Sequence, residues 1–209
     1  MAAPMPPRPF TLIKAALFLV CLGPLLDLTY GVIADTLGAN PIEALTRGLG
    51  DWALRFLLIT LAVTPLRRLS GAAWLLRLRR MLGLYAFFYA LLHVLSYVWL
   101  DQFFDGAAIL KDVFKRPFIS VGFASFLLLI PLAATSTNTM IRRLGGARWQ
   151  ALHRTVYAIG LFAVLHFWWM VKQDITQPAL YAATLALLLG VRVYWAVLPG
   201  VVGNIIHRS

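Results

Sequence analysis

Long runs of apolar residues, separated by short groups of charged residues, glycine or proline, dominate the chain. Each run approaches the roughly 20 residues that an α-helix needs to cross a hydrocarbon layer about 30 Å thick. The pattern predicts six membrane spans, at 10–33, 49–66, 81–100, 117–135, 151–171 and 178–198. The second span is the weakest because Arg55 interrupts it and Pro65 lies near its end. We include it because the charge pattern requires an even number of spans.

The composition agrees with this pattern. Of the 209 residues, 61% are hydrophobic, and the mean hydropathy of +0.79 exceeds what a water-soluble core of this size needs. The longest connections, 101–117 and 136–150, leave no room for a separate soluble domain. We therefore expect an all-α integral membrane protein built as a six-transmembrane helical bundle over residues 10–198.

The distribution of charge predicts the orientation of the bundle. A net charge of +11 can indicate nucleic-acid binding, but here the basic residues lie in short segments between spans, so we expect no nucleic-acid partner. With the N-terminus in the cytoplasm, most Lys and Arg fall in inner segments and most acidic residues in outer ones. Residues 1–9 and the tail 199–209 are thus both expected to be cytoplasmic. Because no small-residue cleavage site follows the first run, we expect an uncleaved first span.

Three of the four histidines lie within predicted spans. These are His93, His153 and His166, whereas His207 lies in the tail and is expected at the surface. Ionisable residues inside membrane spans are rare and usually face the interior of a bundle, which makes the three a candidate functional site. The single cysteine, Cys21, excludes a C-x-x-C-H attachment for covalent haem and a thiolate cluster.

Two of these histidines are expected at the same depth. His93 lies 13 residues beyond Arg80 and His166 lies 12 residues beyond Arg154, so both stand about 20 Å above the cytoplasmic ends of their helices. Two imidazoles at equal depth on neighbouring helices are what a bis-histidine haem requires. The alternative is that each imidazole only forms a hydrogen bond between helices.

His153 is expected about 20 Å below His166, near the cytoplasmic surface, where it is a candidate ligand of a second, inner haem. Counting back from His93 places Arg79 or Arg80 at the facing position, and a charged guanidinium cannot ligate iron. Thirteen helical steps separate His153 and His166 by roughly 140°, so either the helix bends near Gly160 or the two histidines face haem on different sides of it. The alternative is a solvated imidazole.

Several arginines are candidate contacts for haem propionates, which are anionic. For an inner haem these are Arg77, Arg79, Arg80, Arg148 and Arg154. For an outer haem the candidate is Arg55, although an ion pair with Asp51, one turn earlier, also accounts for a charge inside a span. The positive-inside rule equally accounts for the inner group.

Three segments carry a family resemblance: RRMLGLYAFFYALLH (79–93), LAATSTNTMIRRLGGARWQALHRTVY (132–157) and LFAVLHFWW (161–169). With them the chain resembles, over nearly its whole length, the MsrQ (YedZ) family of haem-binding membrane subunits of the bacterial periplasmic methionine sulfoxide reductase system. That family resembles the ferric reductase-like transmembrane domain of NADPH oxidases, in which two helices each carry two haem-ligating histidines. Of the four ligand positions, three are filled by His93, His153 and His166, and the fourth by Arg79.

The resemblance implies an electron-transfer subunit in the bacterial inner membrane that binds one or two b-type haems. Electrons would come from the quinone pool or a cytoplasmic flavin reductase and pass to a periplasmic molybdopterin catalytic subunit that repairs oxidised methionines. FMN is also attributed to the family. The sequence has no G-x-G-x-x-G motif after a strand and no nucleotide domain, which favours a relay subunit over a stand-alone catalyst.

Two other functions are consistent with buried histidines. One is a histidine relay for proton or small-solute transport, which needs a continuous polar path. Spans three and five offer for it chiefly Tyr85, Tyr89, Ser96 and Tyr157. The other is a non-redox membrane anchor for a periplasmic enzyme, which has no need for buried histidines.

Overall fold

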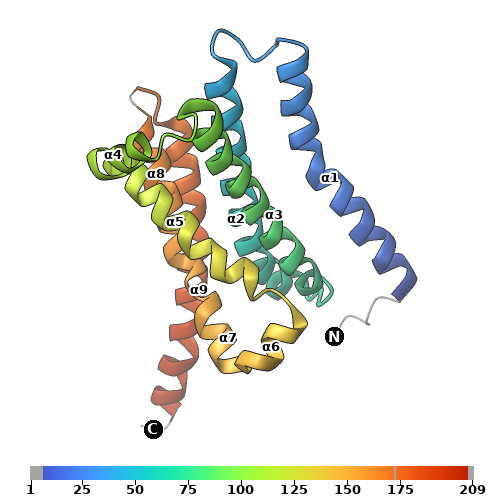
Figure 1. Ribbon diagram of the computed structural model, residues 1–209. Coiled ribbons are helices and arrows are strands. Elements are labelled where there is room, and N and C mark those ends of the chain that lie inside the picture. The colour runs from blue at the N-terminus through green and yellow to red at the C-terminus, as the bar shows by residue number, and fades with distance from the viewer. Residues whose placement is uncertain (1–6, 172, 207–209) are drawn as a thin grey trace.

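The computed structural model describes residues 7–171 and 173–206, with side chains described for 10–171 and 173–197. Every regular element in these residues is a helix (Figure 1). The long helices are α1 (Pro7–Ile33), α2 (Pro41–Ser70), α3 (Leu75–Ser96), α5 (Pro117–Ala134), α8 (Val156–Met170) and α9 (Thr176–Ile206). The short ones are the π-helix η1 (Tyr97–Asp101), α4 (Gly106–Lys115), α6 (Asn138–Leu144) and α7 (Gly146–His153).

The helical membrane architecture predicted from the sequence is confirmed. Five described segments are long and apolar enough to cross a membrane, namely Phe10–Ile33, Pro41–Ser70, Leu75–Asp101, Pro117–Ala134 and Thr176–Val197. The predicted span 151–171 is not one continuous helix. Its first residues belong to α7, the chain turns at 154–155, and α8 has only 15 residues.

The bend in this region lies at 154–155 and not near Gly160, the place considered for bringing His153 and His166 to one pocket. Tight i to i−3 hydrogen bonds form it, from the Thr155 amide to the Leu152 carbonyl at 3.1 Å and from the Tyr157 amide to the Arg154 carbonyl at 3.1 Å. Gly160 lies inside the regular part of α8 instead, where a Cβ would stand 3.2 Å from a methyl carbon of Leu185. The role of Gly160 is therefore close packing against α9.

Helix α2 is longer than the predicted span 49–66 because capping residues, not hydropathy, determine its ends. The Asn40 side chain accepts a hydrogen bond from the Glu43 amide at 3.2 Å, and Pro41 occupies the first turn. At the other end Gly71, with φ of 70°, donates its amide to the Arg67 carbonyl at 2.9 Å.

Short helices fill the two connections that were predicted as loops. Asp105 caps α4 by accepting hydrogen bonds from the amides of Ala107 and Ala108, at 2.9 and 3.0 Å. Thr137 caps α6 by accepting one from the Met140 amide at 3.2 Å. Each cap satisfies amides that the first turn of a helix leaves without partners.

The long helices form two packed pairs. Helix α2 packs along α3 and helix α5 packs along α8, while α9 contacts α8 and α2 and α1 lies on the flank of α2 and α3 (Figure 1). The start of α1 and the end of α9 lie at the same end of the bundle. The space between the two pairs is where the histidine-bearing helices α3 and α8 face each other.

Polar side chains form hydrogen bonds with backbone groups near two prolines in the long helices. Tyr89 donates its hydroxyl to the Cys21 carbonyl at 2.8 Å and accepts the Leu25 amide at 3.1 Å, next to Pro24. Arg192 donates to the Leu61 carbonyl, which Pro65 cannot bond. The Tyr89 hydroxyl is therefore engaged with the backbone of α1.

Candidate functional site

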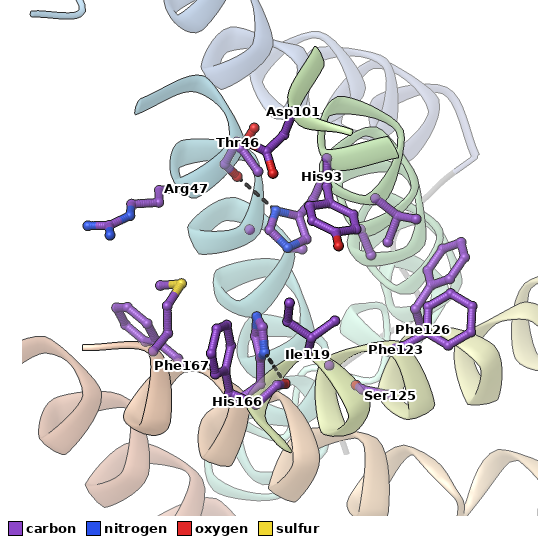
Figure 2. A pocket seen from close by; sticks show the side chains of 18 of the residues that line it. Thr46, Arg47, His93, Asp101, Ile119, Phe123, Ser125, Phe126, His166 and Phe167 are labelled. Atoms are coloured by element: carbon purple, nitrogen blue, oxygen red, sulfur yellow. Dashed lines mark hydrogen bonds between the residues drawn. The ribbon is translucent and has the colours of Figure 1, made fainter. Parts of the chain in front are cut away.

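A cavity of about 570 Å³ lies between the two helix pairs, toward the end of the bundle that carries α4 (Figure 2). His93 of α3 and His166 of α8 line it from opposite sides, and Figure 2 shows the two imidazoles facing each other. Aromatic residues such as Phe123, Phe126 and Phe167 contribute to walls that are mostly apolar. This volume is within the range of pockets that hold cofactor-sized ligands. We call this space the outer cavity.

The distance between the two imidazoles suits a shared metal. Their ring centroids are 6.2 Å apart, and the ring planes are inclined by 70°. Two imidazoles that bind one metal ion, each through a nitrogen at about 2 Å, have ring centres roughly 6 Å apart. The structure thus brings together the pair that the sequence placed at equal depth.

Helix α2 orients the imidazole of His93. Its Nδ1 lies 2.8 Å from the carbonyl oxygen of Thr46, and its ring lies against Gly50, one turn further along α2. A Cβ at Gly50 would stand 3.0 Å from Nδ1 and 3.1 Å from Cε1, which is closer than nearly all real Cβ contacts. An alanine at this position would therefore require the ring to shift by a few tenths of an ångström.

Helix α5 orients the imidazole of His166 in the same way. Its Nδ1 lies 2.7 Å from the carbonyl oxygen of Phe118, and its ring lies against Gly122. A Cβ at Gly122 would stand 2.6 Å from Nδ1 and 2.9 Å from Cε1. We call each combination of a helix carbonyl and a glycine four residues later a glycine cradle.

The glycine cradles determine which nitrogen of each ring can bind a metal. A carbonyl oxygen only accepts, so each Nδ1 carries the proton, and each Nε2 keeps a free lone pair. This is the tautomer of a metal-ligating histidine whose other nitrogen donates to the backbone. Gly50 and Gly122 were not identified from the sequence, where an isolated glycine in an apolar helix has no distinctive spacing.

The cations at the outer cavity differ from the predicted one. Arg47 and Arg116 line it, each paired with a carboxylate one turn earlier, Glu43 and Asp112. Arg55 does not line the cavity, so the prediction that it reaches an outer propionate finds no support in the geometry.

The contacts of Arg55 also differ from the ion pair that was the alternative explanation for it. Its Nε donates to the Tyr181 hydroxyl at 2.9 Å, and its guanidinium lies over the Trp52 ring at 4.6 Å. The ion pair with Asp51 is absent from the described residues, in which only Arg47 and Arg116 form ion pairs. A hydroxyl and an aromatic face stabilise this partly buried charge instead.

A second, smaller cavity of about 300 Å³ lies toward the opposite end of the bundle, and we call it the inner cavity. It is lined by His153 together with Arg79, Arg80 and Trp149. His153 Nδ1 lies 3.1 Å from the Trp149 carbonyl of its own helix, and its ring stacks on the Trp149 indole at a centroid distance of 3.8 Å. Its Nε2 is buried and has no hydrogen-bond partner among the residues that the structure describes.

The electrostatics of the inner cavity favour a neutral imidazole. Burial lowers the pKa of His153, and the positive charges of Arg79 and Arg80 lower it further. The nearby carbonyls of Trp149 and Leu132 act in the opposite direction. His153 thus presents an unprotonated nitrogen at neutral pH.

The remaining predicted residues lie elsewhere. Arg77 lies over the Phe10 ring at 5.1 Å, and Arg80 also donates to the Asn138 side chain at 2.8 Å. Arg148 and Arg154 are exposed and line neither cavity. Of the five arginines predicted for an inner haem, Arg79 and Arg80 are therefore the two at the inner cavity. His207 lies outside the described residues.

Comparison with known proteins places the chain in a family. Residues 49–164 match the family described as "Ferric reductase like transmembrane component". A protein of Herminiimonas arsenicoxydans, named "Protein-methionine-sulfoxide reductase heme-binding subunit MsrQ", is 58% identical over 92% of this chain and 89% of its own length. Proteins with the same name from Azospira oryzae and Rhodospirillum rubrum are 59% and 55% identical, over 90% and 88% of this chain and 81% and 88% of their own lengths.

No solved structure matches the chain. The matched family region contains the cradle glycines Gly50 and Gly122 together with His93 and His153. Thr46 precedes this region by three residues, and His166 follows it by two. The relatives extend over His166 and most of the remaining chain. The chain therefore belongs to the ferric reductase-like transmembrane family and, within it, to the MsrQ haem-binding subunits of protein-methionine-sulfoxide reductase.

Proposed function

We propose that the chain binds a b-type haem in the outer cavity, with His93 and His166 as axial ligands, and uses it to pass electrons across the membrane. The single observation that carries this proposal is the pair of facing imidazoles, 6.2 Å apart, whose Nδ1 atoms are both engaged by backbone carbonyls. The residues fit the group because each ring is held in a glycine cradle with Nε2 left free.

The protein would contribute orientation, burial and charge to this site. Bound between two histidines, the haem iron supplies a one-electron couple whose potential depends on ligands and burial. The apolar walls of the outer cavity exclude water, and Arg47 and Arg116 are the cations placed to meet the propionates. Because both guanidiniums already pair with carboxylates, propionate binding would compete with those ion pairs.

The expected path of the electrons follows from the orientation of the bundle. We take α8 as the sixth crossing, which places both ends of the chain in the cytoplasm and the outer cavity toward the periplasm. The donor would be the quinone pool or a cytoplasmic flavin reductase. The acceptor would be the molybdopterin catalytic subunit of a periplasmic methionine sulfoxide reductase. The membrane would be the bacterial inner membrane.

The inner cavity is the place for a second haem. His153, with its buried Nε2, would be the imidazole ligand, and Arg79 lines the same cavity. The inner cavity has about half the volume of the outer one, so a haem there requires its walls to move apart. We assign FMN to neither cavity.

The test is a reduced-minus-oxidised visible spectrum of the purified protein, measured together with the haem-to-protein ratio. We expect the split band of low-spin bis-histidine haem, with a ratio between one and two. A histidine-relay transporter would instead be colourless and would show pH-driven uptake in haem-free vesicles. A non-redox anchor would keep full partner activity when His93 and His166 are both replaced by alanine.

A further inference from the structure

The connection between the two helix pairs carries large apolar side chains that nothing in the bundle covers. On α4, Leu110 is 58% exposed and Phe114 is 79% exposed. In the turn before it, Phe103 and Phe104 are 80% and 64% exposed. We call these four residues, which lie outside the packed core, the outer apolar patch; one of them, Phe103, also lines the outer cavity.

The side chains of helix α4 point in three directions. Ile109 and Val113 line the outer cavity, Leu110 and Phe114 follow each of them by one residue and face outward, and the lysines at 111 and 115 complete the polar side. The apolar arc is therefore wider than the cavity requires. Half of it covers the site, and half is exposed with no covering partner among the described residues.

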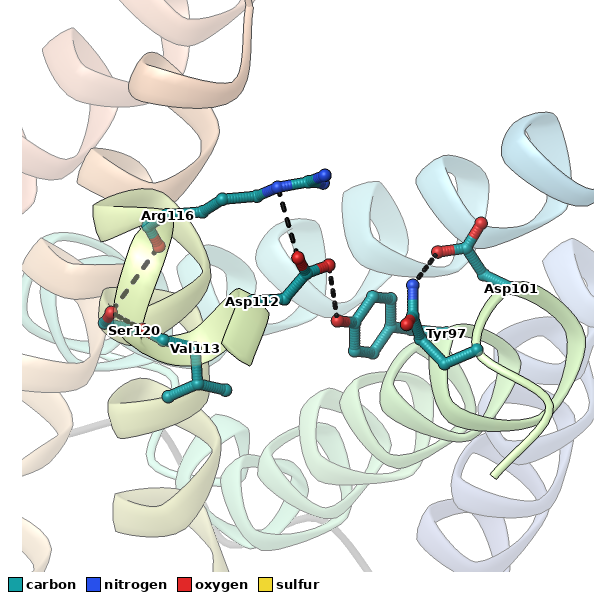
Figure 3. A network of polar contacts seen from close by, with 7 residues as sticks. Tyr97, Asp101, Asp112, Val113, Arg116 and Ser120 are labelled. Atoms are coloured by element: carbon teal, nitrogen blue, oxygen red, sulfur yellow. Dashed lines mark hydrogen bonds and ion pairs between the residues drawn. The ribbon is translucent and has the colours of Figure 1, made fainter. Parts of the chain in front are cut away.

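A polar network fixes the direction in which the exposed half points (Figure 3). The Tyr97 hydroxyl of η1 donates to the Asp112 carboxylate at 3.2 Å, and Arg116 pairs with the same carboxylate at 3.4 Å. The hydroxyl of Ser120 donates to the Val113 carbonyl. Because these contacts hold the side of α4 that carries Asp112 to the bundle, Leu110 and Phe114 stay on the outward side of the helix.

The backbone before α4 also keeps its aromatic side chains exposed. Phe103 and Phe104 have φ of 47° and 61°, a left-handed conformation that bulky residues rarely adopt. The amide of Phe104 bonds to the Val98 carbonyl at 2.9 Å, which holds the turn in place. Two strained residues that both expose phenyl rings indicate that these rings have an apolar environment outside the chain.

The position of the patch points to the lipid–water interface as that environment. Helix α4 lies on the flank of the bundle, roughly crosswise to the long helices, at the end where α3 leads into α5 (Figure 1). The exposed indole of Trp99 lies in η1, directly after α3, and that of Trp169 lies in the last turn of α8. Apolar and aromatic residues on one side of a crosswise helix, with lysines on the other, are typical of helices that lie in a membrane interface.

We propose that α4 and the turn before it form an interfacial anchor, whose outer apolar patch inserts into the outer leaflet of the bilayer. Lys111 and Lys115 meet the phosphate head groups, and the exposed patch continues the lipid-facing surface of the membrane-spanning helices. Ile109 and Val113 belong to the same helix and line the outer cavity. The bilayer would therefore help to hold this wall of the cavity in place. This inference does not depend on which cofactor the cavity holds.

The test places a nitroxide spin label on each side of α4 in nanodiscs of phosphatidylethanolamine and phosphatidylglycerol. The carriers are Leu110→Cys, Phe114→Cys and, as a matched control on the same helix, Lys111→Cys, each with Cys21→Ala to remove the buried native thiol. Leu187→Cys on the exposed side of α9 is the reference for a lipid-facing site. Collision of each label with oxygen, which concentrates in lipid, is compared with collision with a water-soluble nickel chelate.

We expect labels at 110 and 114 to behave like the one at 187, with oxygen accessibility several-fold above nickel accessibility, and the label at 111 to show the reverse. Nickel accessibility at 110 and 114 equal to that at 111 would overturn the proposal and would indicate a water-exposed surface that awaits a soluble partner. Low accessibility to both reagents at 110 and 114 would also overturn it, because it would indicate contact with a second copy of the chain. Elution as one species in size-exclusion chromatography verifies that each variant is folded.

Discussion

The outer and inner cavities both present a histidine, but they hold it in different ways. Each outer imidazole bonds to a carbonyl of a neighbouring helix, His93 to α2 and His166 to α5. The inner imidazole of His153 bonds to the carbonyl of Trp149, four residues earlier in its own helix. A hydrogen bond between helices fixes the position of a ring relative to the bundle, whereas a hydrogen bond within one helix fixes it only relative to α7.

The surroundings of the rings differ in the same sense. Both outer rings lie against glycines, whereas Gly83, the glycine that lines the inner cavity, leaves an ordinary 3.6 Å between a built Cβ and the Thr60 methyl group. The outer imidazoles face each other, and the inner one shares its cavity with the guanidinium of Arg79. The comparison teaches that an imidazole in this bundle is fixed relative to a second helix only where that helix offers it a carbonyl and space.

The largest expected effect is on the outer pair. Replacing His93 or His166 by alanine removes one axial ligand, and we expect the split low-spin band to disappear from the reduced-minus-oxidised spectrum. His153→Ala is the matched control, because that ring lies in the other cavity, and it should leave the outer band in place. A full-intensity band in His93→Ala would contradict the assignment of this ligand.

The next effect tests the glycine cradles. We expect Gly122→Ala to weaken haem retention and to lower the free energy of unfolding by about 1–3 kcal/mol, since an added methyl overpacks the His166 ring. Gly50→Ala should act in the same direction but less strongly, because its Cβ would stand 3.0 rather than 2.6 Å from the ring. Haem loss to apomyoglobin and thermal unfolding are the measurements.

Gly190→Ala is the control for this series, because a Cβ there meets nothing within 4 Å. Removing a glycine from the interior of a helix is expected to stabilise it by about 1 kcal/mol in the absence of a clash. Equal haem loss from the variants at 122 and 190 would show that the cradle has no specific effect.

The third prediction concerns a variant that makes the inner cavity more similar to the outer one. Arg79→His removes a charge from the inner cavity and supplies a second imidazole facing His153. We expect a larger low-spin band per protein than in the wild type, whereas Arg79→Gln, which also removes the charge, should not increase it. An unchanged band in Arg79→His would mean that these two positions cannot share one iron.

The smallest expected effect is a pH dependence of stability. Burial lowers the pKa of His153 in the folded protein, so below about pH 6.5 the unfolded chain binds a proton that the folded chain does not. This difference lowers stability as the pH falls, and His153→Asn removes it. We expect the unfolding midpoint to decrease more from pH 7.5 to 5.5 in the wild type than in His153→Asn; parallel curves would mean that the ring titrates normally.

The sequence predicted those features that depend on position along a helix axis. Hydropathy located the long helices, and the constant rise per residue placed His93 and His166 at one level, where the structure indeed brings their rings together. The six-span count, the cytoplasmic termini and the role of each histidine as a ligand remain predictions. The ends of α2 and the short helices α4 and α6 differ from the prediction because caps such as Asn40, Asp105 and Thr137 override hydropathy.

The features that the sequence did not reveal depend on lateral neighbours. Arg55 contacts Tyr181, which is 126 residues away, and the cations that reach the outer cavity are Arg47 and Arg116. The helix break at 154–155 lies one and a half turns before Gly160, at a place without glycine or proline. Residue types alone do not indicate which arginine turns inward or where a helix bends against its neighbours.

By itself, the sequence determined that this is a helical membrane protein with two histidines at a common depth, because apolar length and helical rise act along one axis and need no partner. Only the tertiary structure decided that these imidazoles meet carbonyls 47 and 48 residues away and rest on Gly50 and Gly122. The physical reason is that lateral packing between helices, which selects the neighbour of each ring, depends on the shapes of all the side chains between them.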